Sequence, residues 1–553
     1  MSHRETVVYH QVSEETTLFS TTTRTSVVDY ATISKTKHIY SYITLADIFQ
    51  KVVYTTIITS LLLYIYLYLK LGSKYAIACY FVFTCLSWFT AAAVNFLDDY
   101  LSRKMGIMIG FGFFISGVAI ISGLSHYIVD NSTLRYIVLI PLYFICIGES
   151  LCKTLLGDFG HEQLSKVRFT EQLKAYTDNV YWIGHLGAIF LIAFLLGIAE
   201  FASFEVSYGL CCVSLAFGMA SFMMGWSKFV KQDSLKKYSI KLLFLLFKES
   251  RKIKKELSQR CKSEMVDDST SFKGSPQHWL DYARTKFGGS YSDSIVQEAK
   301  SFFKMSQIFI SFIPYWICNA QGYSTFIFQA FHLNTSFGSY TFAVSWIALV
   351  NIIAVLTFVK IFEKVVFPAL RRNGYSFLTK WRIIVGMMCA LFSMVLAGTL
   401  QLIMQHYAQK EGTKFHVIGK ANISYVSHVH ILWAVPQFIF LGISEMLVGL
   451  TGLGLACKLC PDKFQKTITS VYYLMVAIGH VLTLLVICTG YFTSENYFEG
   501  FSAVIYFYSL AGVALIAIIL FTVILSYQES MTFVVHDSAS PNTKSSDTVS
   551  SIL

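Results

Sequence analysis

The chain has 553 residues, of which 54% are hydrophobic and only 14% are charged. Soluble domains carry about 25% charged residues, so this composition excludes an ordinary soluble protein and indicates a membrane protein. The net charge of +11 comes from basic residues spread over many predicted loops. That spread favours contact with the inner face of a membrane over binding of nucleic acid.

Long apolar runs recur along the whole sequence. A helix needs about 20 apolar residues to cross the hydrocarbon core of a bilayer, and we count about twelve runs of this length. We therefore expect an all-α, multi-pass membrane protein with twelve transmembrane helices. The runs centre near Leu61, Phe83, Ile115, Phe144, Phe190, Ser214, Ile313, Ile352, Ala390, Ile439, Ala477 and Leu515.

A polar, basic segment divides these runs into two sets of six. The pattern predicts a tail over residues 1–44, a bundle over 45–228, a loop over 229–300, a second bundle over 301–527 and a disordered tail over 528–553. No apolar core precedes a cleavage site in the first residues, so we expect no cleaved signal peptide.

The loop contains the segment SLKKYSIKLLFLLFKESRKIKKEL, which has an apolar face with lysines around it. We interpret this segment as an amphipathic helix that lies on the membrane surface. The alternative is an extension of the sixth span beyond the membrane.

Basic residues and glycosylation sequons predict the orientation of the chain. Lys and Arg concentrate in the even-numbered loops, and the positive-inside rule then places both termini in the cytosol. The sequons at Asn131, Asn334 and Asn422 all fall in odd-numbered loops, on the opposite side, where glycosylation is possible.

The fourth run contains two charges. Glu149 and Lys153 are four residues apart, which puts both side chains on one face of a helix. A charge in the middle of a membrane helix costs about 2.5–3.5 kcal/mol on insertion scales, so it normally faces a polar interior and has a function there. We therefore expect a charged site inside the bundle.

Residues 147–153 (IGESLCK) and 159–163 (FGHEQ) resemble two motifs of the proton-coupled oligopeptide transporter family, G-x-G-x-x-K-P and F-G-x-D-Q. Further likenesses follow in the order of the family, and the segment WLDYAR in the loop is similar to its peptide/histidine branch. The resemblance implies a major facilitator fold, in which two six-helix bundles hold the substrate between them near the middle of the membrane. The further matches are residues 180–187 (VYWIGHLG), 319–322 (NAQG), 361–368 (IFEKVVFP) and 444–452 (SEMLVGLTG).

The resemblance also implies a substrate site. Lys51 and Lys153 match cations that hold the carboxylate of a peptide, and Glu445 matches the acid that faces its amino terminus. A zwitterion needs such opposite poles in a cavity of low dielectric constant. Other positions of the predicted site are Tyr54, Tyr181, His185 and Asn319 in the pocket, Asp47, Glu149 and Glu445 as proton-coupling candidates, and Asp98 and Arg103 as a gate.

The chain differs from the family at positions that the family uses for proton coupling. The helix-one motif E-x-x-E-R reads DIFQK at residues 47–51, and Asn319 replaces an aspartate. The amide of Gln50 takes up no proton near neutral pH, and Lys51 lacks the planar fork of arginine. Glu149 has no counterpart in the motif. It either replaces the lost acid as a proton carrier or forms a permanent ion pair with Lys153.

We expect a secondary transporter for di- and tripeptides, or for histidine, coupled to protons. The alternatives are a transport-impaired member that acts as a membrane scaffold or sensor, and a facilitator with a changed substrate and no proton coupling. We expect no enzyme, because the sequence has no phosphate loop, zinc spacing or nucleophile elbow, and we expect no cofactor, metal or disulfide. The resemblance implies the plasma membrane or an endosomal or lysosomal membrane.

Overall fold

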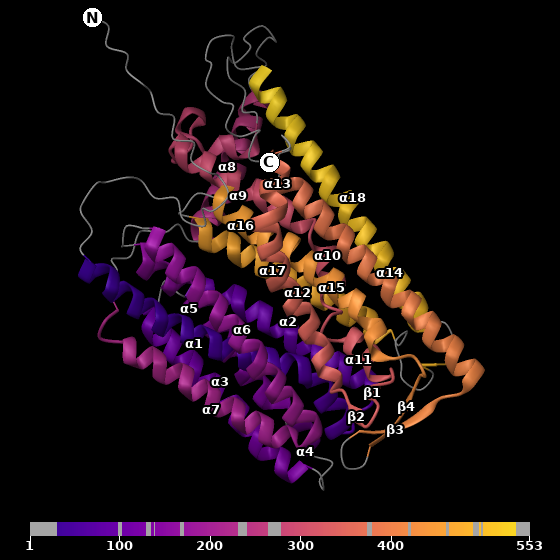
Figure 1. The fold of residues 1–553 in the computed structure, drawn as a ribbon. Helices are drawn as coiled ribbons and strands as arrows, with labels where there is room; N and C mark the ends of the chain where they lie inside the picture. The colour runs from indigo at the N-terminus through magenta and orange to yellow at the C-terminus, as the bar shows by residue number, and fades with distance from the viewer. Residues whose placement is uncertain are drawn as a thin grey trace, which may run out of the picture.

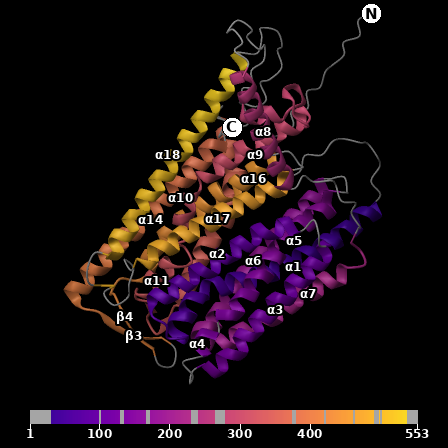
Figure 2. The same cartoon turned by 180° about the vertical axis from the view of Figure 1, so that it is seen from behind.

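The computed structural model describes residues 30–97, 102–128, 134–137, 139–165, 171–229, 240–263, 278–372, 379–418, 422–459, 464–489, 497–498 and 502–537. Two helical bundles, one from each half of the chain, lie side by side (Figures 1 and 2). The first contains α1 (Tyr30–Leu63), the π-helical η1 (Tyr64–Tyr68), α2 (Ser73–Leu97), α3 (Arg103–Ile128), α4 (Leu134–Ile137), α5 (Leu139–Ser165), α6 (Glu171–Phe201) and α7 (Phe204–Gly225).

The second bundle is built from more, shorter pieces. It contains α9 (Asp293–Ile310), α10 (Ile313–Asn319), α11 (Thr325–Phe331), η4 (Val344–Trp346), α12 (Ile347–Ile361), η5 (Phe362–Val366), α13 (Phe367–Arg372), α14 (Thr379–Glu411), η6 (Ile431–Ala434), α15 (Val435–Ser444), η7 (Glu445–Leu450), α16 (Thr451–Leu459), α17 (Gln465–Cys488) and α18 (Ser502–Asp537).

Two small antiparallel hairpins lie at one end of this bundle, which we call the hairpin end of the molecule (Figure 1). The segment between the bundles, with α8 (Ile240–Ser263), η2 (Trp279–Ala283) and η3 (Thr285–Phe287), lies at the opposite end, which we call the loop end. The hairpins are formed by β1 (Ser336–Phe337) with β2 (Tyr340–Thr341), and by β3 (Lys414–Ile418) with β4 (Asn422–Val426).

Within the described residues, eleven helical segments are long and apolar enough to cross a membrane. The remaining predicted run, centred near Ile313, is divided into α9, α10 and α11. Pro314 stands in the first turn of α10, where its missing N–H costs no helical hydrogen bond but where it separates α10 from the helix before it. This interruption explains why the run is apolar in sequence but not one continuous helix.

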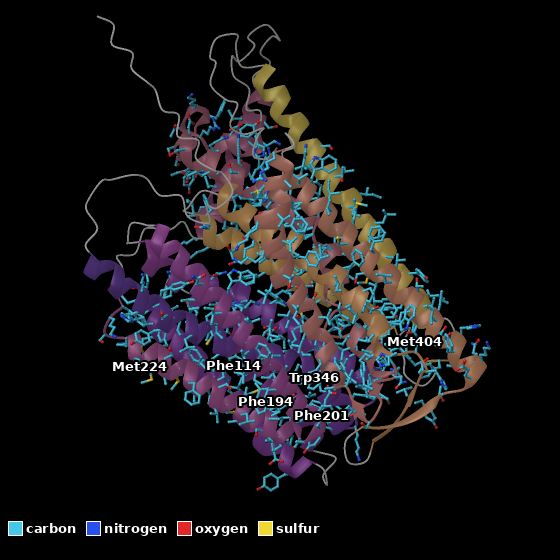
Figure 3. The ribbon with its side chains drawn as sticks, viewed as in Figure 1. Phe114, Phe194, Phe201, Met224, Trp346 and Met404 are labelled. Atoms are coloured by element: carbon cyan, nitrogen blue, oxygen red, sulfur yellow. The ribbon has the colours of Figure 1, made fainter. Side chains whose placement is uncertain are left out.

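The surface of the bundles is apolar as well as their interior. Phe114 of α3 and Met404 of α14 are completely buried, whereas the ring of Phe194 on α6 is 60% exposed on the outer surface (Figure 3). Exposed aromatic and aliphatic side chains of this kind are stable against lipid but not against water. The protein is therefore a multi-pass membrane protein, as the composition predicts.

The amphipathic segment of the loop is the separate helix α8. The helix α7 ends at Gly225 and is followed by a turn, so the alternative of a continuous extension of the sixth span is wrong. Leu243 and Leu246 are buried, and the ring of Phe247 packs edge-on against Trp279 of η2 at 5.5 Å. The apolar face thus covers the loop, while contact with a membrane surface stays a prediction.

The outer helices extend beyond the predicted bundle boundaries. The helix α1 begins at Tyr30, within the segment predicted as a tail, α9 begins at Asp293, and α18 continues to Asp537. Residues 538–553 of the predicted disordered tail lie outside the described residues.

Candidate functional site

Lys153 lies in the middle of α5, one helical turn after Glu149. Its Nζ atom is 3.6 Å from Glu149 Oε1, and the two side chains are 23% and 1% exposed. A charge that is almost completely buried needs a partner and further hydrogen bonds. The helical spacing thus produces the ion pair that the sequence predicts.

Further hydrogen bonds to Glu149 come from the neighbouring helix. The hydroxyl group of Ser87 on α2 donates to Glu149 Oε2 at 2.6 Å. The Ser150 hydroxyl donates to the backbone carbonyl of Ser87 at 2.8 Å and lies 3.4 Å from the same carboxylate oxygen. The short Ser87 contact is a charge-assisted hydrogen bond, so the carboxylate of Glu149 is held by α2 as well as by Lys153.

The position of Glu149 depends on its neighbour Gly148. A Cβ atom at Gly148 would lie 2.3 Å from the backbone nitrogen of Phe114 on α3. No side chain fits there, so α3 and α5 pack with their backbones in close approach, as small residues permit between membrane helices. Gly148 thus faces α3, whereas Glu149 and Lys153 share a different face of α5, from which Glu149 reaches Ser87 of α2.

Aromatic rings from three helices surround the Lys153 ammonium group. Its Nζ atom is 3.3 Å from the ring centre of Trp88, 5.8 Å from that of Tyr54 and 5.9 Å from that of Tyr473. The rings of Trp88 and Tyr473 lie 5.5 Å apart. These distances are typical of cation–π contacts. Because Tyr473 belongs to α17, the site of Lys153 extends across both bundles.

The helix-one residues form their own pair. Lys51 Nζ lies 2.6 Å from Asp47 Oδ2, and the side chains are 47% and 21% exposed. The Gln50 amide lies 3.5 Å from the same carboxylate, and the described residues offer no hydrogen-bond partner to Gln50 Oε1. Lys51 is therefore less buried than Lys153.

Glu445 is the predicted acidic group of the substrate site, and it belongs to the second bundle. It begins the π-helical segment η7, a geometry that is frequent at functional sites. Its Oε2 atom accepts a hydrogen bond from Asn351 Nδ2 at 3.0 Å, and that amide also lies 3.4 Å from the Tyr323 hydroxyl. One turn further on in η7, the Gly449 carbonyl accepts a hydrogen bond at 2.9 Å from Tyr472 of α17, the residue before Tyr473. The element that begins at Glu445 thus packs against the stretch of α17 whose Tyr473 ring lies beside Lys153.

The structure describes only some of the other residues predicted to line the pocket. His185 is half-buried on α6, and the Tyr181 side chain lies outside the described part of the structure. Asn319 ends α10, and its side chain is half-buried.

The predicted gate and the sequons lie at the ends of the bundles. Arg103 begins α3, while Asp98 lies outside the described residues. Asn334 is at the hairpin end, where its Oδ1 atom accepts from the Ser336 amide at 3.0 Å, and Asn422 begins β4. Asn131 lies outside the described residues.

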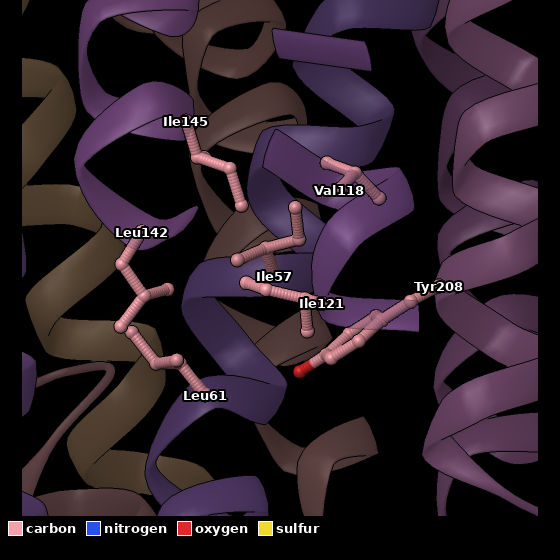
Figure 4. Close-up of a pocket in the computed structure, with 7 residues that line it drawn as sticks. All are labelled: Ile57, Leu61, Val118, Ile121, Leu142, Ile145 and Tyr208. Carbon is pink, nitrogen blue, oxygen red and sulfur yellow. The ribbon is translucent and has the colours of Figure 1, made fainter. Parts of the chain in front are cut away.

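A cavity inside the first bundle has the wrong chemistry for a zwitterion. It is lined by six aliphatic side chains and by Tyr208, whose hydroxyl group lies 3.2 Å from that of Ser60 (Figure 4). No lining residue is charged, so this cavity offers no pole for a carboxylate or an ammonium group. The aliphatic residues are Ile57, Leu61, Val118, Ile121, Leu142 and Ile145.

Sequence reasoning missed Ser87, Trp88 and Tyr473. A serine next to a tryptophan within an apolar run is a weak signal, because most such residues face lipid or the core. Only the packing of α2 and α17 shows that Ser87 contacts Glu149 and that the rings of Trp88 and Tyr473 face Lys153.

Comparisons with known proteins agree on one family. A family model described as PTR2, POT family, matches residues 104–497, well over half of the chain. The chain is 22% identical over 414 residues to solute carrier family 15 member 3 of Mus musculus, a match that covers 70% of this chain and 68% of the relative.

Solved structures with low sequence identity have the same fold. The POT family transporter PepTSo has a TM-score of 0.66 at 17% identity, with 89% of this chain and 98% of that chain covered. A peptide transporter POT in complex with alafosfalin has a TM-score of 0.62 at 14% identity, with 91% and 99% covered. These likenesses confirm the predicted major facilitator fold of two bundles.

Proposed function

Because the chain belongs to the POT family, we propose that it is a secondary transporter that moves di- and tripeptides, or an amino acid such as histidine, across a membrane by alternating access. The observation that carries this proposal is the position of the Glu149–Lys153 pair at the interface of the bundles, where Lys153 Nζ lies 5.9 Å from the ring centre of Tyr473 on α17. The solved complex of a peptide transporter POT with alafosfalin supports a peptide-like ligand.

The charges of Lys153 and Glu445 match the two ends of a zwitterion. The peptide carboxylate binds Lys153, with Lys51 as a second cation nearby, and the amino terminus binds Glu445, which Asn351 orients. The rings of Tyr54, Trp88 and Tyr473 form the walls beside Lys153 and exclude water there. Exclusion of water strengthens both attractions.

We assign the proton-carrying role to Glu149. The family acid at position 50 is an amide here, whereas Glu149 is an acid in direct contact with the cation that binds the substrate. Protonation of Glu149 would release Lys153 to bind a carboxylate, and loss of the proton would restore the ion pair. Within the described residues, the titratable groups around Glu149 include Lys153, Cys146 and Cys152 on α5 and Tyr54 on α1, and Ser87 contributes its hydroxyl from α2.

The orientation is part of the same proposal. The positive-inside rule places the loop end, with α8, in the cytosol. Asn334 and Asn422 both lie at the opposite, hairpin end, which supports their exposure to the side where glycosylation occurs. We assign the protein to the plasma membrane or to an endosomal or lysosomal membrane, as the resemblance of the loop segment WLDYAR to the peptide/histidine branch implies.

A second candidate is a facilitator without proton coupling. It is favoured by helix one, where Gln50 carries no proton and Lys51 already pairs with Asp47 at 2.6 Å. In this alternative, Glu149 and Lys153 remain a permanent ion pair.

Uptake of radiolabelled dialanine into vesicles that contain the purified protein tests both candidates. We expect concentrative uptake when an inward proton gradient is applied, and a decrease in kcat/KM of at least about tenfold in Lys153→Gln and in Glu445→Gln. The matched controls are Lys252→Gln and Glu256→Gln, an exposed i,i+4 pair on α8 with 3.9 Å between its charges. Uptake without a response to the gradient supports the facilitator, and no uptake or binding of any peptide contradicts both.

A further inference from the structure

The carboxylate of Glu200 joins the two bundles at the hairpin end. Glu200 lies in the last turn of α6, in the first bundle. Its Oε2 atom accepts a hydrogen bond from the Val344 amide at 2.7 Å, and its Oε1 atom accepts one from the Ser345 amide at 2.7 Å. Val344 and Ser345 are the first two residues of η4, which continues into α12 of the second bundle.

These two hydrogen bonds take the place of a side-chain N-cap for the helix η4–α12. The first amides of a helix have no partner within the helix, and the residue at the cap position, Ala343, has no side chain that accepts a hydrogen bond. An acidic side chain at this position is stabilising because the amides and the helix dipole both favour a negative charge. Glu200 therefore caps a helix of the other bundle.

The next residue strengthens the same contact in the opposite direction. Trp346 Nε1 donates to the backbone carbonyl of Ala193 on α6 at 2.8 Å. The indole lies over Gly197, where a Cβ atom would be 3.1 Å from the ring, and packs edge-on against Phe201 at 5.8 Å. Three hydrogen bonds thus connect one turn of η4 with the last turns of α6.

The contact lies where the bundles come together. The helices α6 and α12 contact each other, and the ends of the bundles near the hairpins lie closer together than the ends near α8 (Figure 1). The rings of Tyr66 and Phe331, from different bundles, are 5.6 Å apart on the same side. A transporter that opens toward the hairpin end must separate these surfaces.

We propose that Glu200 is a gating residue, which holds the hairpin end closed by capping the helix η4–α12 across the bundle interface. The bond to two backbone amides is made in the closed arrangement and is lost when the bundles separate on this side. The proposal rests on alternating access, and hence on the proposed function, but it concerns a residue that lies outside the substrate site.

The test is the distance between the two bundles at the hairpin end. Spin-labelled non-natural amino acids are placed at Ala202, which is exposed beyond α6, and at Tyr340, which is 79% exposed in β2. The full chain is reconstituted in lipid nanodiscs, and the distribution of label distances is measured by double electron–electron resonance. This measurement does not require transport.

We expect the ratio of open to closed molecules to rise about tenfold in Glu200→Ala, as loss of a helix cap predicts. Glu200→Gln keeps one acceptor oxygen and should give an intermediate shift. The control is Glu205→Ala, five residues further on, where the acid stands in the first turn of α7 in its own bundle. Its distance distribution should match that of the wild type.

A second variant removes a donor instead of the acceptor. Val344→Pro deletes one amide hydrogen at the first position of η4, where proline is tolerated, and Ala343 before it already has the extended conformation that proline requires (ψ 126°). We expect the same direction of shift as in Glu200→Ala. Unchanged distances in both variants would overturn the proposal. A shift in both, together with no peptide uptake by the wild type, would retain the gate and contradict only the proposed substrate.

Discussion

The substitution Glu149→Gln separates the two roles that a buried acid beside Lys153 can have. Glutamine has nearly the same shape and still accepts a hydrogen bond from Ser87 through its carbonyl oxygen, so the packing of α2 and α5 is kept. The substitution removes only the negative charge and the ability to carry a proton. It therefore tests the electrostatic argument without creating a cavity.

The size of the effect follows from the geometry of the pair. Two unit charges about 4 Å apart interact by about 4 kcal/mol at an effective dielectric constant of about 20. The Nζ atom of Lys153 is 3.6 Å from Glu149 Oε1, but Lys153 keeps 23% exposure and a ring contact with Trp88 at 3.3 Å, and both reduce its dependence on Glu149. We therefore expect a decrease in the free energy of unfolding of about 1–3 kcal/mol.

The transport assay gives the decisive result. In Glu149→Gln we expect exchange of dialanine across the vesicle membrane to continue, because Lys153 still binds the carboxylate, whereas stimulation by an inward proton gradient disappears. Glu256→Gln, in the exposed pair of α8, should keep the stimulation of the wild type. If gradient-driven uptake by Glu149→Gln equals that of the wild type, Glu149 is not the proton carrier and the pair is a permanent structural one.

Three other regions give independent predictions. Trp88→Leu removes the ring that lies closest to the Lys153 ammonium group. Because cation–π contacts contribute about 0.5–2 kcal/mol, we expect the KM for dialanine to rise about tenfold. An unchanged KM would contradict a role for the ring. Gly148→Ala forces α3 and α5 apart and should lower the free energy of unfolding by about 1–3 kcal/mol, whereas Gly157→Ala, with no atom within 4 Å of the added Cβ, should change the thermal midpoint little. In the loop, burial lowers the pKa of His278 below its ordinary value of 6.5, and the nearby charge of Lys300 lowers it further. In the neutral form, His278 Nδ1 accepts a hydrogen bond from the Leu280 amide at 3.2 Å. The unfolded chain therefore takes up a proton first, and the stability of η2 is present above pH 6.5 and falls as the pH drops below this value. The protection factors of the amides of residues 279–283, which compare each exchange rate with its intrinsic rate at the same pH, should decrease from pH 7 to pH 5, and His278→Asn, which caps without titrating, should abolish the change.

Helix periodicity and hydropathy determined a large part of this protein before any tertiary contact was known. The i,i+4 spacing alone makes Glu149 and Lys153 neighbours in any helix, and the structure confirms the pair at 3.6 Å. Apolar runs of membrane-spanning length likewise require helices, because a backbone in lipid must satisfy its hydrogen bonds within each segment. The run near Ile313 is the exception, since hydropathy does not register the break before Pro314.

Tertiary structure decided which groups from different helices meet. The sequence separates Trp88 and Tyr473 from Lys153 by whole helices, and only the packing of α2 and α17 against α5 places their rings beside its ammonium group. The bonds from Glu200 to the amides of η4 are of the same kind, because their donors are backbone groups, which every residue except proline carries and which leave no trace in a sequence. Periodicity fixes contacts within one helix, whereas contacts between helices depend on the direction and rotation of each helix, which packing of the complete chain sets.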